Sequence, residues 1–126
     1  MNLNQVTVNV TDMDAAIAFY ETLGLRLIVH THERYARFEC PQGDATFSLH
    51  LSPQPTENGP VIYFECADVD AEIERITALG LAVEQQPKEQ PWLWREAYLR
   101  DPSGNRICLY HAGPARRFPP WRTSDT

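Results

Sequence analysis

The sequence predicts an α+β fold made of two tandem copies of one βαβββ unit. The first observation is an internal repeat: residues 6–27 align without a gap on residues 62–83, and seven of these 22 positions are identical. The identities include Asp12 and Asp68, ahead of each predicted helix, and a Leu-Gly-Leu triplet after it. Residues 34–38 and 41–44 then recur as residues 95–99 and 102–105, before a closing strand in each copy. Identities at both ends of an element indicate duplication of a whole structural unit.

Each copy opens with a strand and a helix. Apolar residues alternate over residues 6–10 and 62–66, which predicts strands with one buried face. Asp12 and Asp68 follow at the position where a carboxylate accepts hydrogen bonds from the first helical turn. Apolar residues at helical spacing predict helices over residues 13–22 and 69–78. Gly24 and Gly80 supply the left-handed residue at which each helix ends.

Three more strands complete each copy. Second strands are expected to begin at residues 25–29 and 81–83, glycine-containing hairpin turns at 41–44 and 102–105, and closing strands at 46–51 and 106–111. We therefore expect one domain over residues 1–126: a first repeat (3–52), a proline-rich linker (53–60), a second repeat (61–111) and a tail (112–126). The tail is rich in Pro and Arg and is expected to be extended.

Composition excludes several classes of function. The formal net charge is −6 and the pI about 5.1, so no basic face for nucleic acid is expected. No apolar run approaches the roughly 20 residues of a membrane span, and no basic segment followed by an apolar one begins the chain. The three widely spaced cysteines are expected to be reduced thiols. These features predict a cytoplasmic protein with a small-molecule ligand.

Two segments resemble the vicinal oxygen chelate superfamily of glyoxalases, bleomycin resistance proteins and extradiol dioxygenases. Residues 10–25, VTDMDAAIAFYETLGL, are similar to its opening, and residues 99–110, LRDPSGNRICLY, to its closing hairpin. With the repeat, the resemblance covers about residues 3–111. It implies that the mixed sheets curl into a cup that holds the substrate, with the helices outside, and that the chain forms a homodimer.

The resemblance also implies four places for metal ligands, one on the first and one on the last strand of each repeat. Here they fall on Gln5, Ser48, Val61 and Cys108. Metal-dependent members carry His, Gln or Glu at these places. Valine cannot bind a metal, serine is a poor ligand, and a lone thiolate is unusual for a hard cation. We therefore expect no cofactor, and we disfavour a divalent metal at the family's position.

Strand alternation predicts which side chains line the cup. Apolar residues such as Val8, Phe38 and Leu99 face the helices, and mostly polar or aromatic residues face the other way. The candidate ligand-binding residues on that face are Gln5, Thr7, Asn9, Arg37, Ser48, Tyr63, Tyr98, Cys108 and Tyr110. Tyr35 and Glu96 share the face. These side chains fit a small polar or aromatic molecule; the alternative is a sheet that shows its polar face to water.

His50 and Glu65 are the candidate catalytic residues. His50 is suited to act as a general base near neutral pH, or else it hydrogen-bonds a neighbouring tyrosine. Gln5, His50 and Glu65 together form a conceivable displaced metal site. An ion pair from Glu65 or Glu39 to an arginine of the cup is the alternative for these carboxylates.

A loop with two tryptophans, Trp92 and Trp94, has no counterpart in the first repeat. Both are candidate ligand-binding residues, as a lid over the cup. The alternatives are packing against Phe118 and Trp121 of the tail, or a contact with a second subunit.

Three functions remain open. The first is a metal-dependent glyoxalase-type lyase or dioxygenase, which the ligand places oppose unless the site is displaced. The second is a metal-free lyase or isomerase that uses His50 with Glu65, Arg37 or a tyrosine. The third is sequestration of a ligand without chemistry. Whether the protein is an enzyme is not decided by the sequence.

Overall fold

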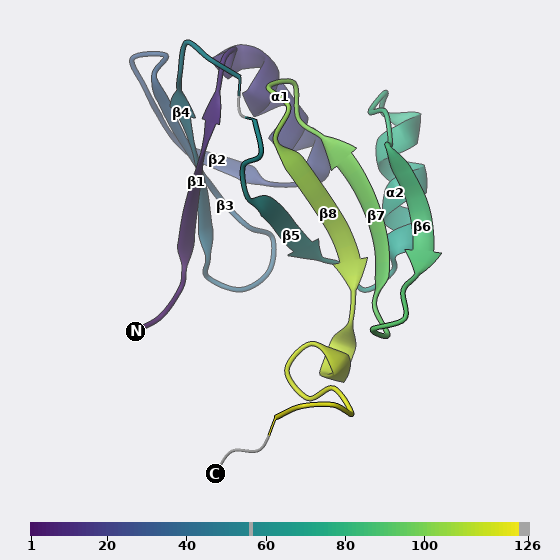
Figure 1. Ribbon diagram of the computed structural model, residues 1–126. Helices are drawn as coiled ribbons and strands as arrows, with labels where there is room; N and C mark the ends of the chain where they lie inside the picture. The colour runs from purple at the N-terminus through teal and green to yellow at the C-terminus, as the bar shows by residue number, and fades with distance from the viewer. Residues whose placement is uncertain (56, 124–126) are drawn as a thin grey trace. The chain divides into compact units, whose positions relative to one another are not determined.

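The computed structural model describes residues 1–55 and 57–123 and divides the chain into two compact units. Unit 1 contains Met1–Pro60 and Arg100–Arg106; unit 2 contains Val61–Leu99 and Ile107–Thr126. Each repeat supplies one helix and one four-stranded mixed sheet (Figure 1). The predicted α+β fold with two tandem βαβββ repeats is confirmed.

The first repeat contains β1 (Gln5–Val10), α1 (Met13–Leu23), β2 (Arg26–Thr31), β3 (Tyr35–Glu39) and β4 (Thr46–Leu51). The strand order is β1-β4-β3-β2, with β1 parallel to β4 and the other pairs antiparallel. The closing strand has the predicted bounds, and the helix extends one residue further than predicted.

Helix α1 has the two capping residues expected from the sequence. The Asp12 carboxylate accepts from the Ala15 amide at 3.1 Å, and Gly24 adopts a left-handed conformation with φ of 109°. On the inner face, the fully buried Tyr20 packs its ring against Phe47, with centroids 4.8 Å apart, and against Phe38. The alternation of β3 and β4 places these apolar side chains toward the helix.

The hairpin turn of the second repeat, residues 102–105, is hydrogen-bonded to residues of the first repeat. The Tyr20 hydroxyl donates to Asp101 Oδ2 at 2.7 Å, and Asn105 Nδ2 donates to the Asn9 carbonyl at 2.7 Å. The Thr11 amide donates to Ser103 Oγ at 2.8 Å. These bonds explain why Arg100–Arg106 belongs to unit 1, although the internal repeat assigns it to the second copy.

The second repeat contains β5 (Val61–Glu65), α2 (Val69–Ala78), β6 (Gln85–Glu89), β7 (Arg95–Arg100) and β8 (Arg106–His111), followed by a 3-10 turn, η1 (Gly113–Ala115). The strand order is β5-β8-β7-β6. Asp68 caps α2 by accepting from the Ala71 amide at 3.0 Å. Helix α2 and strand β8 have the predicted bounds.

Two expectations for the second repeat are wrong. The strand expected to begin at residues 81–83 begins at Gln85, because the Leu81 amide still bonds to the Ile76 carbonyl and pairing with β7 starts at Glu84. The described part of the tail is not extended. It folds into η1 and further turns, including a bond from the Phe118 amide to the Pro114 carbonyl.

No helix among the described residues is long and apolar enough to cross a membrane. Cys40, Cys66 and Cys108 are free thiols.

Candidate functional site

Strand register in unit 1 brings the predicted polar residues into three neighbouring rows on one face of the sheet. The rows run across β1, β4 and β3: Gln5, Thr46 and Glu39; Thr7, Ser48 and Arg37; Asn9, His50 and Tyr35. The intervening residues Val8, Leu49 and Phe38 are buried on the other face, as alternation predicts.

Tyr35, Arg37 and Ser48 form a hydrogen-bonded triad on this face. Arg37 Nε donates to the Tyr35 hydroxyl at 2.8 Å, and the Tyr35 and Ser48 hydroxyls are 2.8 Å apart. The Arg37 guanidinium also lies 5.4 Å from the centroid of the Tyr35 ring. Burial acts to raise the pKa of Tyr35, but hydrogen bonds from Ser48 and Arg37 and the positive charge of Arg37 outweigh it and lower that pKa. The triad therefore offers a phenol that ionises more easily than usual.

His50 and Gln5 lie beside this triad. His50 is exposed and is the Cα partner of both Asn9 and Tyr35 in the sheet. Gln5 Oε1 accepts from the Thr46 hydroxyl at 2.8 Å. His50 is thus positioned next to the phenol whose pKa is lowered.

An aromatic cluster covers the corresponding face in unit 2. Trp94 stacks on Tyr110 with centroids 4.7 Å apart, and Tyr63 meets both rings edge-on at 6.0 and 5.6 Å. Cys108 is fully buried, and Val61 packs against the same group. Tyr63 remains 47% exposed, so the cluster presents an accessible aromatic face.

A buried carboxylate lies beside the aromatic cluster. Glu96 is 2% exposed and accepts from the indole Nε1 of Trp92 at 3.1 Å and from the Tyr98 hydroxyl at 3.2 Å. Burial and contacts with the Cys108 thiol raise the pKa of Tyr98 well above its usual value, and the charge of Glu96 acts in the same direction. Tyr98 therefore stays a neutral donor over the whole physiological range.

Glu65, predicted to be catalytic, is engaged in holding the start of the tail. Its carboxylate accepts from the Ala112 and Gly113 amides at 2.8 and 3.0 Å, and His111 lies 3.9 Å away. Burial acts to raise the pKa of Glu65, but the two backbone bonds and the charges of His111 and Arg116 outweigh it and lower the pKa. A carboxylate stabilised in its charged form is a weak base, so the geometry does not favour a catalytic role.

The expected ion pair with a cup arginine is also wrong. Glu39 pairs with Arg26 of β2 at 3.6 Å, and Glu65 lies 3.9 Å from the His111 ring, with no ion pair to a cup arginine among the described residues.

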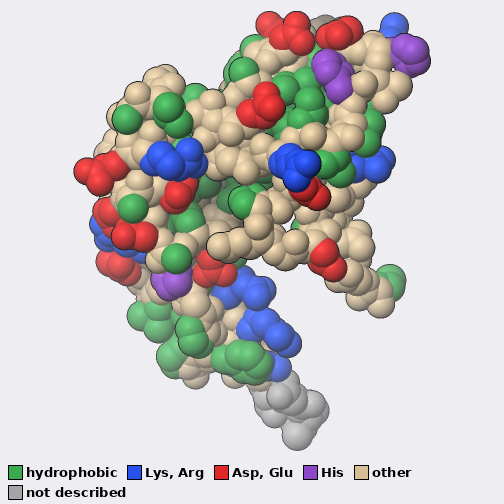
Figure 2. Space-filling view, turned by 180° about the vertical axis from the view of Figure 1, so that it is seen from behind, with side chains coloured by type: hydrophobic (Ala, Val, Ile, Leu, Met, Phe, Trp, Pro, Cys, Tyr) green, Lys and Arg blue, Asp and Glu red, His purple; other side chains and the backbone are tan. Residues whose placement is uncertain are grey.

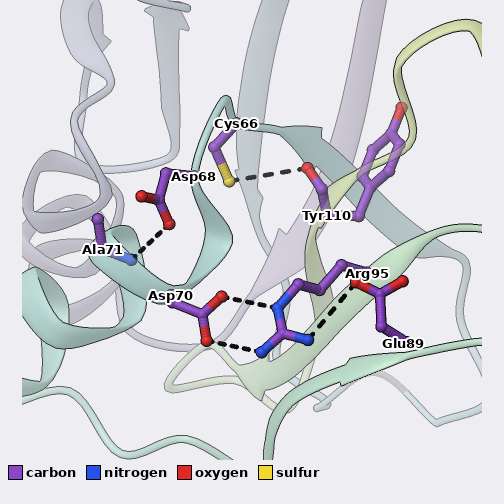
Figure 3. A network of polar contacts seen from close by, with 7 residues as sticks. All are labelled: Cys66, Asp68, Asp70, Ala71, Glu89, Arg95 and Tyr110. Atoms are coloured by element: carbon purple, nitrogen blue, oxygen red, sulfur yellow. Dashed lines mark hydrogen bonds and ion pairs between the residues drawn. The ribbon is translucent and has the colours of Figure 1, made fainter.

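A further pocket of about 230 Å³ lies at the beginning of α2. Figure 3 shows the Asp70 and Glu89 carboxylates directed at the guanidinium of Arg95, with Asp68 engaged in capping the helix. Asp70 accepts two bonds from Arg95, at 2.6 and 2.7 Å, and Glu89 lies 3.6 Å from it. Each of these three carboxylates therefore has a partner within the protein: Arg95 for Asp70 and Glu89, and the Ala71 amide for Asp68.

Within residues 1–55 and 57–123, no ring contact joins the tryptophans to Phe118 or Trp121 of the tail. The rings that contact Trp94 are Tyr63 and Tyr110, while Phe118 and Trp121 are 59% and 56% exposed. Arginines of the tail flank Phe118 instead, with the Arg122 guanidinium 4.4 Å from its centroid. Figure 2 shows these basic side chains gathered on the segment that leads to the grey C-terminal residues.

The four places implied for metal ligands do not fit a divalent metal. In unit 1, Ser48 is fully buried and bonded to Tyr35, and Gln5 is bonded to Thr46. In unit 2, Val61 has no donor atom, and the Cys108 thiol is fully buried. The displaced combination draws Gln5 and His50 from unit 1 and Glu65 from unit 2. Within either unit, the described residues contain no group of three His, Cys, Asp or Glu that could hold a metal ion.

Sequence reasoning placed Tyr35 and Glu96 on the correct face but did not single them out. An arginine two positions after an inward tyrosine is a signal for the Tyr35 pair, because residues i and i+2 share a face. A glutamate between inward aromatic residues is the corresponding signal for Glu96.

Comparisons with known proteins agree with this architecture. An uncharacterized protein of Mycolicibacterium smegmatis is 29% identical over 109 residues, covering 86% of this chain and 91% of the relative. The crystal structure of lactoylglutathione lyase from Agrobacterium tumefaciens is 25% identical with a TM-score of 0.72, covering 87% of this chain and 92% of that one. TioX from Micromonospora sp. ML1 has the same fold, with 22% identity and a TM-score of 0.71 over 89% of this chain and 99% of its own. The model of the Glyoxalase/Bleomycin resistance protein/Dioxygenase superfamily matches residues 2–109, and the chain belongs to that family.

Proposed function

We propose that the chain binds a small aromatic molecule on the polar faces of its sheets, without a divalent metal at the family's usual ligand places. The observation that carries the proposal is the chemistry of those places. The Ser48 hydroxyl is hydrogen-bonded to Tyr35. Val61 packs against the aromatic cluster and has no atom that could bind a metal. The faces that surround them retain the polar and aromatic groups that recognise a ligand.

Equilibrium binding with and without EDTA tests this proposal. A panel of small aromatics, such as benzoate, benzyl alcohol and benzylammonium, is screened by thermal shift, and hits are measured by calorimetry. We expect at least one dissociation constant that EDTA leaves unchanged, with metal content far below one ion per chain. A stoichiometric metal whose removal abolishes binding would refute the proposal, as would a panel without any binder.

The triad in unit 1 supports a second candidate, metal-free acid–base catalysis. A phenol with a lowered pKa next to a guanidinium can exchange a proton with a bound substrate while the arginine stabilises developing negative charge. His50, its neighbour across the strands, is then a second group for proton transfer. The lactoylglutathione lyase reaction, named for the Agrobacterium structure, is the first to assay.

Tyr35→Phe distinguishes catalysis from binding alone. If the triad is catalytic, this variant loses about 100-fold or more in kcat with little change in KM. Unchanged kcat in Tyr35→Phe would exclude this role, and turnover that requires added metal would exclude the metal-free mechanism.

A further inference from the structure

Glu96 is a buried carboxylate whose described partners are all neutral. Its two hydrogen bonds come from an indole and a phenol, whereas an ionised carboxylate has about four acceptor sites. Lys88 is its Cα partner on β6, yet that exposed lysine makes no ion pair with Glu96 in the described part of the chain. Burying a charge is costly unless an opposite charge accompanies it. Among the described residues, the Glu96 carboxylate therefore has hydrogen-bond donors but no cationic partner.

A second polar side chain on the same face, Gln85, has a donor atom without a hydrogen-bond partner among the described residues. Gln85 is the Cα partner of Tyr98, so both side chains emerge on one side of the sheet. The Gln85 Nε2 atom is buried and has no hydrogen-bond partner among the described residues. An unmade hydrogen bond at a buried donor costs about 1–3 kcal/mol. This donor is available to a ligand that carries a hydrogen-bond acceptor.

Trp92 contacts both Glu96 and solvent. Its indole N–H bonds to Glu96 Oε2 while the side chain remains 43% exposed. It stands on a short loop that the Gln90 amide closes on the Trp94 carbonyl, so rotation of the side chain can open the site without moving the strands. The half-exposed Tyr63 and the stacked Trp94 provide aromatic surface beside it.

We propose that the unit 2 site selects aromatic molecules that carry an ammonium group and a hydrogen-bond acceptor. The ammonium replaces the Trp92 indole N–H on Glu96, the acceptor bonds to Gln85, and the aromatic part lies against Tyr63. The inference rests on the proposed function and names the ligand class of one of its faces. One ligand of this class would supply a cation to the Glu96 carboxylate and an acceptor to Gln85 Nε2.

Calorimetry with benzylammonium and its neutral analogue benzyl alcohol tests the selection for charge. We expect benzylammonium to bind the wild-type protein about ten-fold more tightly than benzyl alcohol, and Glu96→Gln to remove that difference. Glu74→Gln, an exposed position on α2, makes the same change in net charge and is expected to leave binding unchanged. Equal affinity for the two probes, or benzylammonium affinity unaffected by Glu96→Gln, would overturn the proposal.

Trp92→Phe tests the displacement and does not depend on the folding of the Glu96 variant. Because the ligand no longer competes with the indole N–H, benzylammonium is expected to bind about two- to ten-fold more tightly. Weaker binding would identify Trp92 as a ligand contact and overturn the displacement. If benzyl alcohol and benzoate bind in EDTA without preference for the ammonium, this inference fails and the proposed function stands. If nothing in the panel binds, the proposed function fails as well.

Discussion

Tyr20→Phe removes one hydroxyl from the fully buried contact between α1 and the second hairpin turn. The wild-type hydroxyl donates to Asp101 Oδ2 at 2.7 Å. Burial, with the charge of Asp101, raises the pKa of Tyr20 far above its usual value, so the hydroxyl is a donor at every accessible pH. The substitution keeps the ring that packs on Phe47 and removes this one bond.

The expected loss in the free energy of unfolding depends on the hydrogen bonds that Asp101 retains in the variant. A hydrogen bond to a charged acceptor contributes about 1.5–3 kcal/mol to the free energy of unfolding. In the variant, Asp101 still accepts from Asn105 Nδ2 at 2.8 Å and from the Ser103 and Asn105 amides at 2.9 Å. Since the carboxylate keeps three donors, we expect the lower part of the range, about 1.5–2 kcal/mol. For a domain of this length, Tm then falls by roughly 5–10 °C.

Urea denaturation followed by circular dichroism measures this loss. Tyr110→Phe is the matched control, because Tyr110 is 6% exposed and its hydroxyl has no hydrogen-bond partner among the described residues. We expect that control to change the free energy of unfolding by less than about 0.5 kcal/mol. A double-mutant cycle with Asp101→Asn isolates the pair. A loss below about 0.5 kcal/mol in Tyr20→Phe, or no coupling in the cycle, would refute the contribution assigned to this hydrogen bond.

Three further predictions concern pKa values and helix caps. Arg37→Gln removes the cation beside Tyr35 and should raise the pKa of that phenol, as the 295 nm absorbance of a pH titration will show; no change would disprove the coupling. Because the pKa of Glu65 is lowered in the folded protein, its ionised carboxylate stabilises the fold at pH values above the ordinary glutamate pKa. This stabilisation is lost as the pH falls through the pKa that Glu65 has in the folded protein. The protection factors of the amides at the start of η1 should therefore fall in acid in the wild-type protein, and should already be low at neutral pH in Glu65→Ala. Equal protection factors in the two proteins at neutral pH would count against this cap. Asp12→Ala and Asp68→Ala should each lower the free energy of unfolding, measured by urea denaturation, by about 1 kcal/mol. A loss in only one of the two variants would contradict the equivalence of the two helix caps.

The elements predicted best are those specified by local chemistry. Both helices were located because Asp12 and Asp68 supply an acceptor to the first turn, and Gly24 supplies the left-handed residue after the first helix. The closing strands were located because a glycine turn and strict alternation bound them. Each of these signals lies within a few residues of the feature that it determines.

The errors arise where distant contacts override local pattern. Strand β6 begins late because Glu84 and Gln85 find their partner in Tyr98, which no local pattern near residue 81 reveals. The tail folds because the Glu65 carboxylate, 48 positions away, accepts from the Gly113 amide. The same contact occupies the carboxylate of Glu65, the residue that its position on the strand made a candidate for catalysis.

Ser48 shows why a position inherited from a fold family does not carry its chemistry with it. The register of β4 places this residue where the resemblance implies a metal ligand, and the structure confirms that register. Its hydroxyl, however, lies beneath Tyr35, whose own hydroxyl is held by Arg37. A metal at this place would have to break both bonds and approach the Arg37 guanidinium, a cost that one weak hydroxyl ligand does not offset. The register of β4 still directs the Ser48 side chain to this face. The groups that surround it are now the Tyr35 phenol and the Arg37 guanidinium, which are hydrogen-bonded to each other.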